Sequence, residues 1–230
     1  MQSQRRLEVG DFLGKLGICG FFATGVALKV RKIFQTLSEW SSSAASETKL
    51  LTVLSDAASL IFLTLVIAVV FFRLRPVSSA SGFEPRFTAL AGTFLLMSLG
   101  VLPASETPPV LVTLLGLSCI VVGSLLSVYV LSWLGRSFSI MAEARKLITG
   151  GPYSIVRHPL YVTEGIAILG MVLLHWSLLA ALLGLIQTAL QLRRIHNEEK
   201  ILREAFPEYA AYAKRTPRLV PAIITPRRSM

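Results

Sequence analysis

Long apolar stretches separated by short polar segments dominate the chain. Four stretches carry at most one charged residue each, at residues 57–72, 87–102, 110–134 and 160–192. Hydrocarbon about 30 Å thick is crossed by roughly 20 apolar helical residues, so stretches of this length are typical of membrane spans. The pattern predicts an all-α, polytopic transmembrane helical bundle whose ordinary spans lie near residues 12–30, 50–72, 87–102 and 110–134.

The first of these spans has the weakest pattern. Its apolar part runs only from Leu16 to Leu28, and the basic residues before it resemble the start of a signal peptide. The segment that follows, residues 29–32, is itself basic and lacks the small residues of a cleavage site. This favours a retained helix over a cleaved signal peptide.

The stretch at residues 160–192 is too long for one ordinary crossing. As a continuous helix it would measure about 50 Å. It is therefore either one steeply tilted helix or a helical hairpin that turns near residues 175–177, which brings the membrane helices to five or six. A hairpin would return the chain to its starting side and bring Arg157 and Arg193 close together.

Beyond Arg194 apolar and charged positions alternate with the period of an amphipathic helix. Pro207 should end this helix and open a short second one that carries Tyr209 and Tyr212. The expected organisation has three parts: N-terminal transmembrane helices at 1–135, a catalytic and cofactor region at 136–221, and a basic tail at 222–230.

Composition and charge support a membrane protein rather than a nucleic-acid-binding one. The chain is 53% hydrophobic and 16% charged, with a mean hydropathy of +0.64. Its net charge of +10 comes from basic residues between the apolar stretches, where membrane topology explains them. The expected partners are membrane lipids and a lipophilic small molecule or lipid, without nucleic acid; the oligomeric state is left open.

The distribution of Lys and Arg also predicts an orientation. Residues 103–109 contain neither, whereas basic residues crowd the segments at 73–86, 136–157 and from 193 onward. The positive-inside rule puts the basic segments in the cytoplasm, at the plasma or inner membrane if the source is bacterial. The segment at 29–49 has four basic residues yet would lie outside, so the orientation of the first helix stays open.

The two cysteines carry no chemistry in this pattern. Cys19 and Cys119 both lie in apolar stretches, where a single thiol behaves as a small buried hydrophobic group. We expect neither a disulfide framework nor a metal site.

A first candidate site surrounds the Arg157-His158 pair. Adjacent glycines and a proline at residues 150–152 mark a turn, and Pro159 disfavours helix at His158. Two polar side chains would then stand at the start of a helix whose N-terminal amides suit a carboxylate or phosphate. The alternative is that Arg157 only follows the positive-inside rule and His158 caps the helix.

A second candidate site combines Arg194, Glu198 and Glu199 with the tyrosines further on. The four-residue spacings from Arg194 to Glu198 and from Glu199 to Arg203 are also those of ordinary surface ion pairs, which are the commoner case. Against this, Glu199 shares its helical face with apolar residues. A carboxylate on an apolar face needs a cationic partner.

Glu164 is a third candidate, because it lies one turn inside the stretch at 160–192. An ionisable group at that depth is a candidate functional residue. The alternative is that it snorkels to the interface or pairs with Arg157.

These motifs, taken in order, resemble the isoprenylcysteine carboxyl methyltransferase family and its bacterial relatives. The resemblance covers about 80 residues, from about 137 to 221. The matching text is Gly151-Pro152-Tyr153, Arg157-His158-Pro159-Leu160-Tyr161, Glu198-Glu199, Leu202, Phe206, Tyr209, Tyr212 and Arg218-Leu219-Val220-Pro221.

The resemblance implies a function and a set of site residues. It implies an integral-membrane methyltransferase that uses S-adenosyl-L-methionine, and paired glutamates are also a cofactor feature of the related phosphatidylethanolamine N-methyltransferases. The residues it would place around the cofactor are Gly151, Pro152, Tyr153, Arg157, His158, Pro159, Tyr161, Glu198, Glu199 and Tyr209.

Catalysis in such an enzyme would come mainly from alignment. Methyl transfer to a carboxylate or thiolate is an in-line displacement that needs no general base. Arg194 is the candidate to orient an anionic acceptor, and Glu164 or Glu199 could take the proton of an amine acceptor. The acceptor could be the carboxylate of an isoprenylcysteine-like compound or a lipid amine.

Two other functions stay open at this point. A membrane sterol-type reductase similarly pairs an acidic helix with a Tyr-containing tail, but would use NADPH. A non-catalytic transport or binding protein is the second alternative, although the chain shows no inverted repeat.

Overall fold

The computed structural model describes residues 2–38, 40, 46–99 and 107–221, and the predicted basic tail at 222–230 lies outside them. Over these residues the chain is almost entirely helical, as predicted. The helices are α1 (Gln2–Ser38), α2 (Ser46–Phe71), α3 (Phe83–Leu99), α4 (Val110–Leu134), α5 (Pro159–His175), α6 (Leu178–Ala205) and α7 (Tyr209–Arg215). The short elements are β1 (Ser78–Ser79), η2 (Gly135–Ser137), β2 (Glu143–Ala144) and η3 (Gly151–Ser154).

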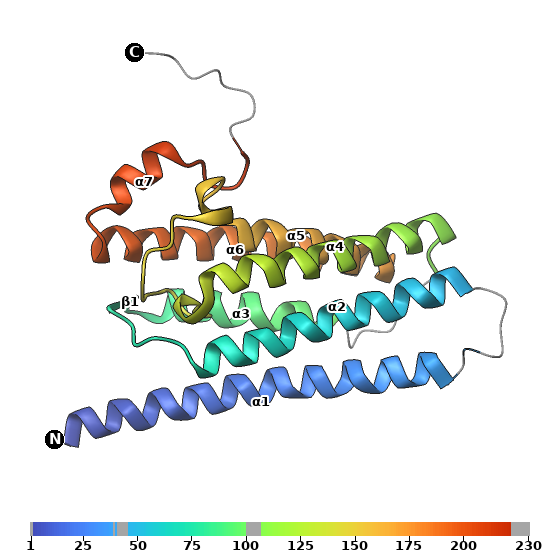
Figure 1. The fold of residues 1–230 in the computed structure, drawn as a ribbon, viewed down its shortest axis with the longest axis horizontal. Coiled ribbons are helices and arrows are strands. Elements are labelled where there is room, and N and C mark those ends of the chain that lie inside the picture. Colours follow the sequence, from blue (N-terminus) through green and yellow to red (C-terminus); the bar gives the residue numbers. More distant parts are fainter. Residues whose placement is uncertain (1, 39, 41–45, 100–106, 222–230) are drawn as a thin grey trace, which may run out of the picture.

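Helices α1 to α6 form a bundle with their long axes running in a similar direction (Figure 1). Among the described residues, three helices are long and apolar enough to cross a membrane, at 47–71, 110–137 and 178–205, and α5 is a shorter apolar helix. Many large apolar side chains point outward; Leu111 and Leu185, for example, are each 68% exposed. This surface is suited to lipid, which confirms the prediction of an all-α membrane bundle.

The stretch at 160–192 is a hairpin, so the single tilted helix is wrong. Helix α5 ends at His175, and Trp176 adopts the left-handed conformation with φ 37°. Ser177 then caps α6, because its hydroxyl accepts a hydrogen bond from the Ala180 amide at 3.1 Å. Helix α6 continues without a break to Ala205, so the amphipathic helix expected beyond Arg194 is the end of the second arm.

Helices α4 and α5 approach each other closely at glycines. A Cβ on Gly123 would lie 2.6 Å from the Ala167 amide nitrogen, and one on Gly170 would lie 2.5 Å from the Gly116 carbonyl oxygen. Small residues at such crossings let helix backbones meet inside a membrane. The buried hydroxyls of Ser127 and Thr163 add a hydrogen bond of 2.8 Å between the same helices. Helix α5 therefore has a fixed position in the bundle.

The basic segments gather at one end of the bundle. There α2 and α4 end, α3 and α5 begin, and α6 runs into α7 (Figure 1). A two-residue antiparallel ladder between β1 and β2 ties the two loops of this end together. We call this the site end, and the α5–α6 turn lies at the opposite end.

Part of the anomalous positive charge of residues 29–49 is neutralised inside the bundle. The Lys29 and Lys32 ammonium groups lie 2.6 and 3.3 Å from the carboxylate of Asp56, which is 1% exposed between α1 and α2. These lysines therefore join two helices, which weakens their value as a topology signal.

Candidate active site

The turn before α5, at η3, contacts α4 on one side and α7 on the other. Gly151 has φ 58°, and a Cβ there would lie 2.5 Å from the ring of Trp133 on α4, so only glycine fits. On the other side, the Tyr212 hydroxyl on α7 donates to the Tyr153 carbonyl at 2.5 Å. Gly151, Pro152 and Tyr153 thus shape and hold the loop.

The Arg157-His158 pair is joined to the C-terminal segment through its backbone. The Arg157 amide donates to the Pro217 carbonyl at 2.8 Å, and the His158 amide donates to the Arg218 carbonyl at 3.1 Å. His158 holds the N-cap position of α5, but its side chain makes no capping hydrogen bond. His158 therefore occupies the N-cap position, as the alternative held, but its ring does not cap the helix.

Glu199 is the centre of this arrangement. Its carboxylate lies 3.2 Å from Arg157 Nη1, 3.3 Å from His158 Nε2 and 2.5 Å from Arg218 Nη2. The Glu199 side chain is only 2% exposed, and the expected cationic partner is present in Arg157 and Arg218. The four-residue pair with the exposed Arg203 is also formed, at 3.5 Å. Buried charges of this kind persist only when paired. We call Glu199, Arg157, His158 and Arg218 the clamp.

Glu198 is placed differently from its neighbour. The Tyr161 hydroxyl donates to Glu198 Oε1, and His158 Nδ1 lies 3.9 Å from Glu198 Oε2. The ring of His158 thus stands between the two glutamates. The Glu198 side chain is 24% exposed and keeps room for a further hydrogen-bond donor.

Arg194 lies beside the clamp without joining it. Its guanidinium carbon is 5.4 Å from the centre of the Tyr161 ring, a cation–π distance, and Nη2 donates to the Ile140 carbonyl at 3.2 Å. Among the described residues it has no carboxylate at ion-pair distance, and its buried Nε has no hydrogen-bond partner. The surface ion pair between Arg194 and Glu198, which the four-residue spacing suggested as the alternative to a functional site, is therefore not formed.

Glu164 faces α6 rather than the interface. The Gln191 side-chain amide donates to Glu164 Oε2 at 3.2 Å. Arg157, the partner considered for Glu164 in the sequence, is held by Glu199 instead.

Two buried tyrosines of α7, Tyr209 and Tyr212, lie near Arg157 of the clamp. Burial, followed by the charge of Glu199, raises the pKa of Tyr209 to about 12, and burial raises the pKa of Tyr212 to about 12. Both phenols are therefore neutral donors at physiological pH. The Tyr209 side chain is 1% exposed, and its hydroxyl has no hydrogen-bond partner among the described residues.

The structure brings the predicted residues into two neighbouring groups. One is the loop before α5 with the clamp, Glu198 and Tyr209; the other is Arg194, Tyr161 and Glu164. Sequence reasoning gave no role to Arg218, although Arg218 stood in the matching text. It also passed over Gln187 and Gln191, whose signal was two amides in an otherwise apolar run.

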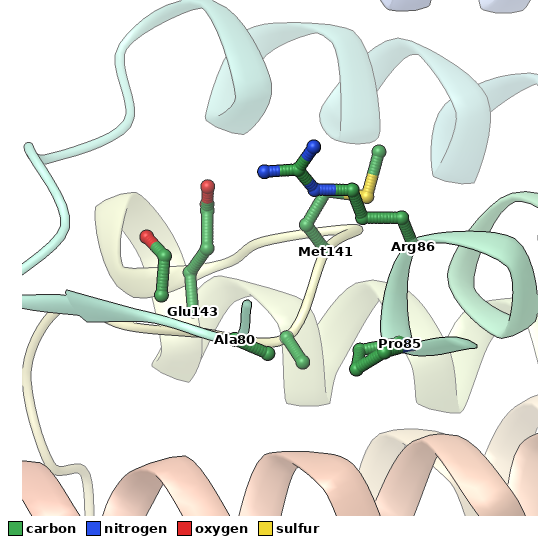
Figure 2. A pocket seen from close by; sticks show the side chains of 7 residues that line it. Ala80, Pro85, Arg86, Met141 and Glu143 are labelled. Atoms are coloured by element: carbon green, nitrogen blue, oxygen red, sulfur yellow. The ribbon is translucent and has the colours of Figure 1, made fainter. Parts of the chain in front are cut away.

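Two surface hollows accompany these residues. One of about 390 Å³ lies against Glu199 and is lined by His196, Lys200, Arg203 and Glu204. The other, of about 160 Å³, lies at the start of α3 between Arg86, Met141 and Glu143 (Figure 2). It contains none of the predicted site residues. Only the first hollow adjoins the candidate active site.

Residues 111–209 match the model of the phospholipid methyltransferase family. The matched segment is similar to phospholipid methyltransferases. It runs from α4 to the first residue of α7 and includes every predicted site residue. The resemblance to integral-membrane methyltransferases is thereby confirmed.

Two curated relatives match the chain in part. The cobalt-zinc-cadmium resistance protein CzcN of Cupriavidus metallidurans is 40% identical over 118 residues, which are 50% of this chain and 51% of that protein. The nickel-cobalt-cadmium resistance protein NccN of Alcaligenes xylosoxydans xylosoxydans is 39% identical over 82 residues, 35% of this chain and 38% of that protein. The chain thus aligns with about half or less of each relative's length. Within the described part of this chain, no group of three or more His, Cys, Asp and Glu side chains could hold a metal ion.

Proposed function

We propose that this protein is an integral-membrane methyltransferase that uses S-adenosyl-L-methionine and methylates a lipophilic acceptor. The observation that carries the proposal is the convergence of the Arg157-His158 pair with Glu198 and Glu199 at one end of the bundle. This convergence falls inside the segment that matches a methyltransferase family.

The donors and acceptors of the site fit S-adenosyl-L-methionine. The half-buried Glu198 carboxylate suits an ammonium group or ribose hydroxyls. The buried Tyr209 hydroxyl and Arg157 Nε have no hydrogen-bond partner of good geometry among the described residues. The Tyr209 hydroxyl lies next to the Arg157 side chain, and the two could together serve an acceptor group of the cofactor. The cofactor would supply a methyl group made electrophilic by the sulfonium.

Glu199 has a different role in this proposal from the one the resemblance implied. Its oxygens are already engaged by Arg157, His158 and Arg218. It would therefore position these residues around the cofactor rather than touch it. Gly151, Pro152, Tyr153 and Pro159 would act in the same way, by fixing the loop.

The acceptor favoured by the site is a lipophilic carboxylate, such as that of an isoprenylcysteine-like compound. Arg194 has no carboxylate within ion-pair distance among the described residues, although the charges of Glu198 and Glu164 act on it, so its guanidinium can orient an anion. The acceptor oxygen would form a bond to the methyl carbon as the carbon–sulfur bond breaks, and no proton need move. Alignment of this kind supplies about 7–11 kcal/mol in favourable cases.

A lipid amine is the second candidate acceptor. It is favoured by Glu164, which lies close to Arg194 in the bundle and could take the amine proton. In either case the apolar acceptor would enter from the bilayer and the cofactor from water. The positive-inside rule assigns the site end to the cytoplasm.

Isothermal titration calorimetry on the purified protein in detergent tests the cofactor half. We expect S-adenosyl-L-methionine to bind, and His158→Ala to weaken that binding. Glu208→Gln, an exposed change at the start of α7, is the control and should bind like wild type. Absence of binding to wild type overturns the proposal, and binding of NADPH instead supports the reductase alternative.

A radiolabelled-methyl assay on total lipid extract tests the transfer. We expect label to enter the lipid fraction with wild type but not with Arg194→Met. Base-labile label indicates a methyl ester, and base-stable label indicates an amine product. Cofactor binding without any transfer supports the non-catalytic alternative.

A further inference from the structure

One face of α6 carries a file of polar side chains deep into the bundle. Gln187, Gln191, Arg194 and Glu198 are spaced by four, three and four residues, so they share one helical face. Gln187 and Gln191 are 2% and 6% exposed. We call these four residues the polar file.

The polar file lies where α6 faces both α3 and α5. Arg194 contacts both helices, because its Cδ is 3.1 Å from a Cβ built on Gly92 and its guanidinium lies over Tyr161. Gln191 bonds to Glu164 on α5, and Gln187 bonds to Gly92 on α3. This seam leads from the candidate active site into the membrane region of the bundle.

The side-chain amide nitrogen of Gln187 has a hydrogen-bond partner, whereas its amide oxygen has none among the described residues. Gln187 Nε2 donates to the Gly92 carbonyl at 2.6 Å. A carbonyl can only accept, so the nitrogen must face it whichever way the amide was assigned. Gln187 Oε1 is then a buried acceptor without a hydrogen-bond partner in the described part of the chain. Such a group needs a donor.

The polar file contains one hydrogen-bond donor and one acceptor that lack partners among the described residues. Arg194 Nε is a buried donor without a partner among the described residues, and Gln187 Oε1 is a buried acceptor. Seven residues separate them, a rise of about 10 Å along the helix. A molecule that satisfies both would offer an anion at one point and a hydrogen-bond donor about 10 Å further along its apolar part.

We propose that Gln187 determines acceptor specificity: the acceptor is a lipophilic acid whose bilayer-embedded part carries a hydroxyl or amide N–H, which Gln187 Oε1 binds while Arg194 holds the carboxylate. This inference depends on the proposed function and narrows its substrate class. A purely structural role would need only the bond from Gln187 Nε2 to Gly92, and would leave the acceptor unaffected.

The test compares two probes, octadecanoic acid and the same acid hydroxylated near the middle of its chain. Methyl transfer from labelled S-adenosyl-L-methionine is measured with the full chain in lipid nanodiscs. We expect wild type to have a KM about tenfold lower for the hydroxylated acid. Gln187→Met should raise that KM about tenfold with little change in kcat, and leave the KM of the plain acid unchanged.

The matched control is Thr188→Val, the exposed neighbour whose hydroxyl bonds within its own helix at 2.9 Å. It should preserve the preference for the hydroxylated acid. Equal KM values for the two acids with wild type overturn the inference, even if Gln187→Met fails to fold. Cofactor binding without methylation of either acid also overturns it, whereas absence of cofactor binding overturns the proposed function itself.

Discussion

The clamp and the polar file are adjacent but differ in how completely their polar groups are satisfied. In the clamp, Glu199 is met by Arg157, His158 and Arg218, and its carboxylate has no need of a ligand. In the polar file, Arg194 and Gln187 each keep a buried atom without a partner among the described residues. The comparison teaches that the Glu199 carboxylate, whose partners are complete, builds the site, whereas the atoms left without a partner, Arg157 Nε, Arg194 Nε and Gln187 Oε1, are suited to meet a ligand. Four substitutions test this division, from the largest expected effect to the smallest.

Glu199→Ala should break the clamp. It leaves Arg157 without its buried counter-charge, and removal of one partner of a buried pair costs about 3–5 kcal/mol. We expect a clearly lower melting temperature in detergent and no measurable cofactor binding. Glu204→Ala removes an exposed carboxylate from the same helix and should leave both values unchanged. A Glu199→Ala protein as stable as wild type would falsify the assignment of Glu199 as a structural centre.

Arg194→Met should impair catalysis while leaving stability and cofactor binding intact, the reverse of what is expected for Glu199→Ala. Because Arg194 makes no ion pair within the described structure, we expect stability and cofactor binding to stay near wild type. Loss of a charged group that orients the acceptor should lower kcat about a hundredfold. The matched control is Arg193→Met, since Arg193 is exposed and pairs with Glu84 on α3 at 2.7 Å. Equal activity losses in the two variants would contradict a role for Arg194 at the acceptor.

Glu198→Gln tests whether Glu198 has a different role from its neighbour Glu199. The side chain is partly exposed and holds only Tyr161 and a distant His158 nitrogen, so stability should change little. We expect the Kd for S-adenosyl-L-methionine to rise about tenfold, as for loss of one charge-assisted hydrogen bond. Calorimetry measures the Kd and thermal melting checks the fold. If the Glu198→Gln protein loses as much stability as the Glu199→Ala protein, both glutamates have a structural role, and the proposed difference between them is wrong.

Tyr209→Phe should give the smallest effect. It removes a buried hydroxyl that has no hydrogen-bond partner among the described residues, so the melting temperature should stay equal or rise slightly. If this hydroxyl serves the cofactor, the Kd should still increase severalfold. Tyr212→Phe provides the contrast, because its hydroxyl donates to the Tyr153 carbonyl and its loss should lower stability. Unchanged cofactor binding in Tyr209→Phe would remove Tyr209 from the binding residues.

Much of the fold could be predicted because the bilayer imposes a simple rule on the sequence. The spans predicted at 50–72, 87–102 and 110–134 begin within a few residues of α2, α3 and α4, and Pro207 marked the break before α7. The choice between hairpin and tilted helix could not be made, since it depends on Trp176 adopting a left-handed conformation that residue type does not favour. Periodicity alone does not reveal such a turn.

The residues of the candidate site could be predicted from the sequence, but most of the ion pairs and hydrogen bonds between them could not. Burial of Glu199 on an apolar face correctly implied a cation. Which cation could not be deduced, because Arg218 reaches it through a segment that folds back from beyond α7. The four-residue spacing suggested a pair between Arg194 and Glu198 that the packing of Arg194 against α3 and α5 does not allow. Spacing fixes which residues share a face, whereas neighbouring helices decide their partners.

The backbone bonds from residues 157 and 158 to Pro217 and Arg218 set an order for biosynthesis. Helices α1 to α6 emerge from the ribosome first and can enter the membrane before residue 218 exists. The loop before α5 can be completed only afterwards, when the last segment returns to it. During synthesis, an inserted bundle therefore precedes the completed loop, and the proposed methyl transfer would have to wait for the last segment.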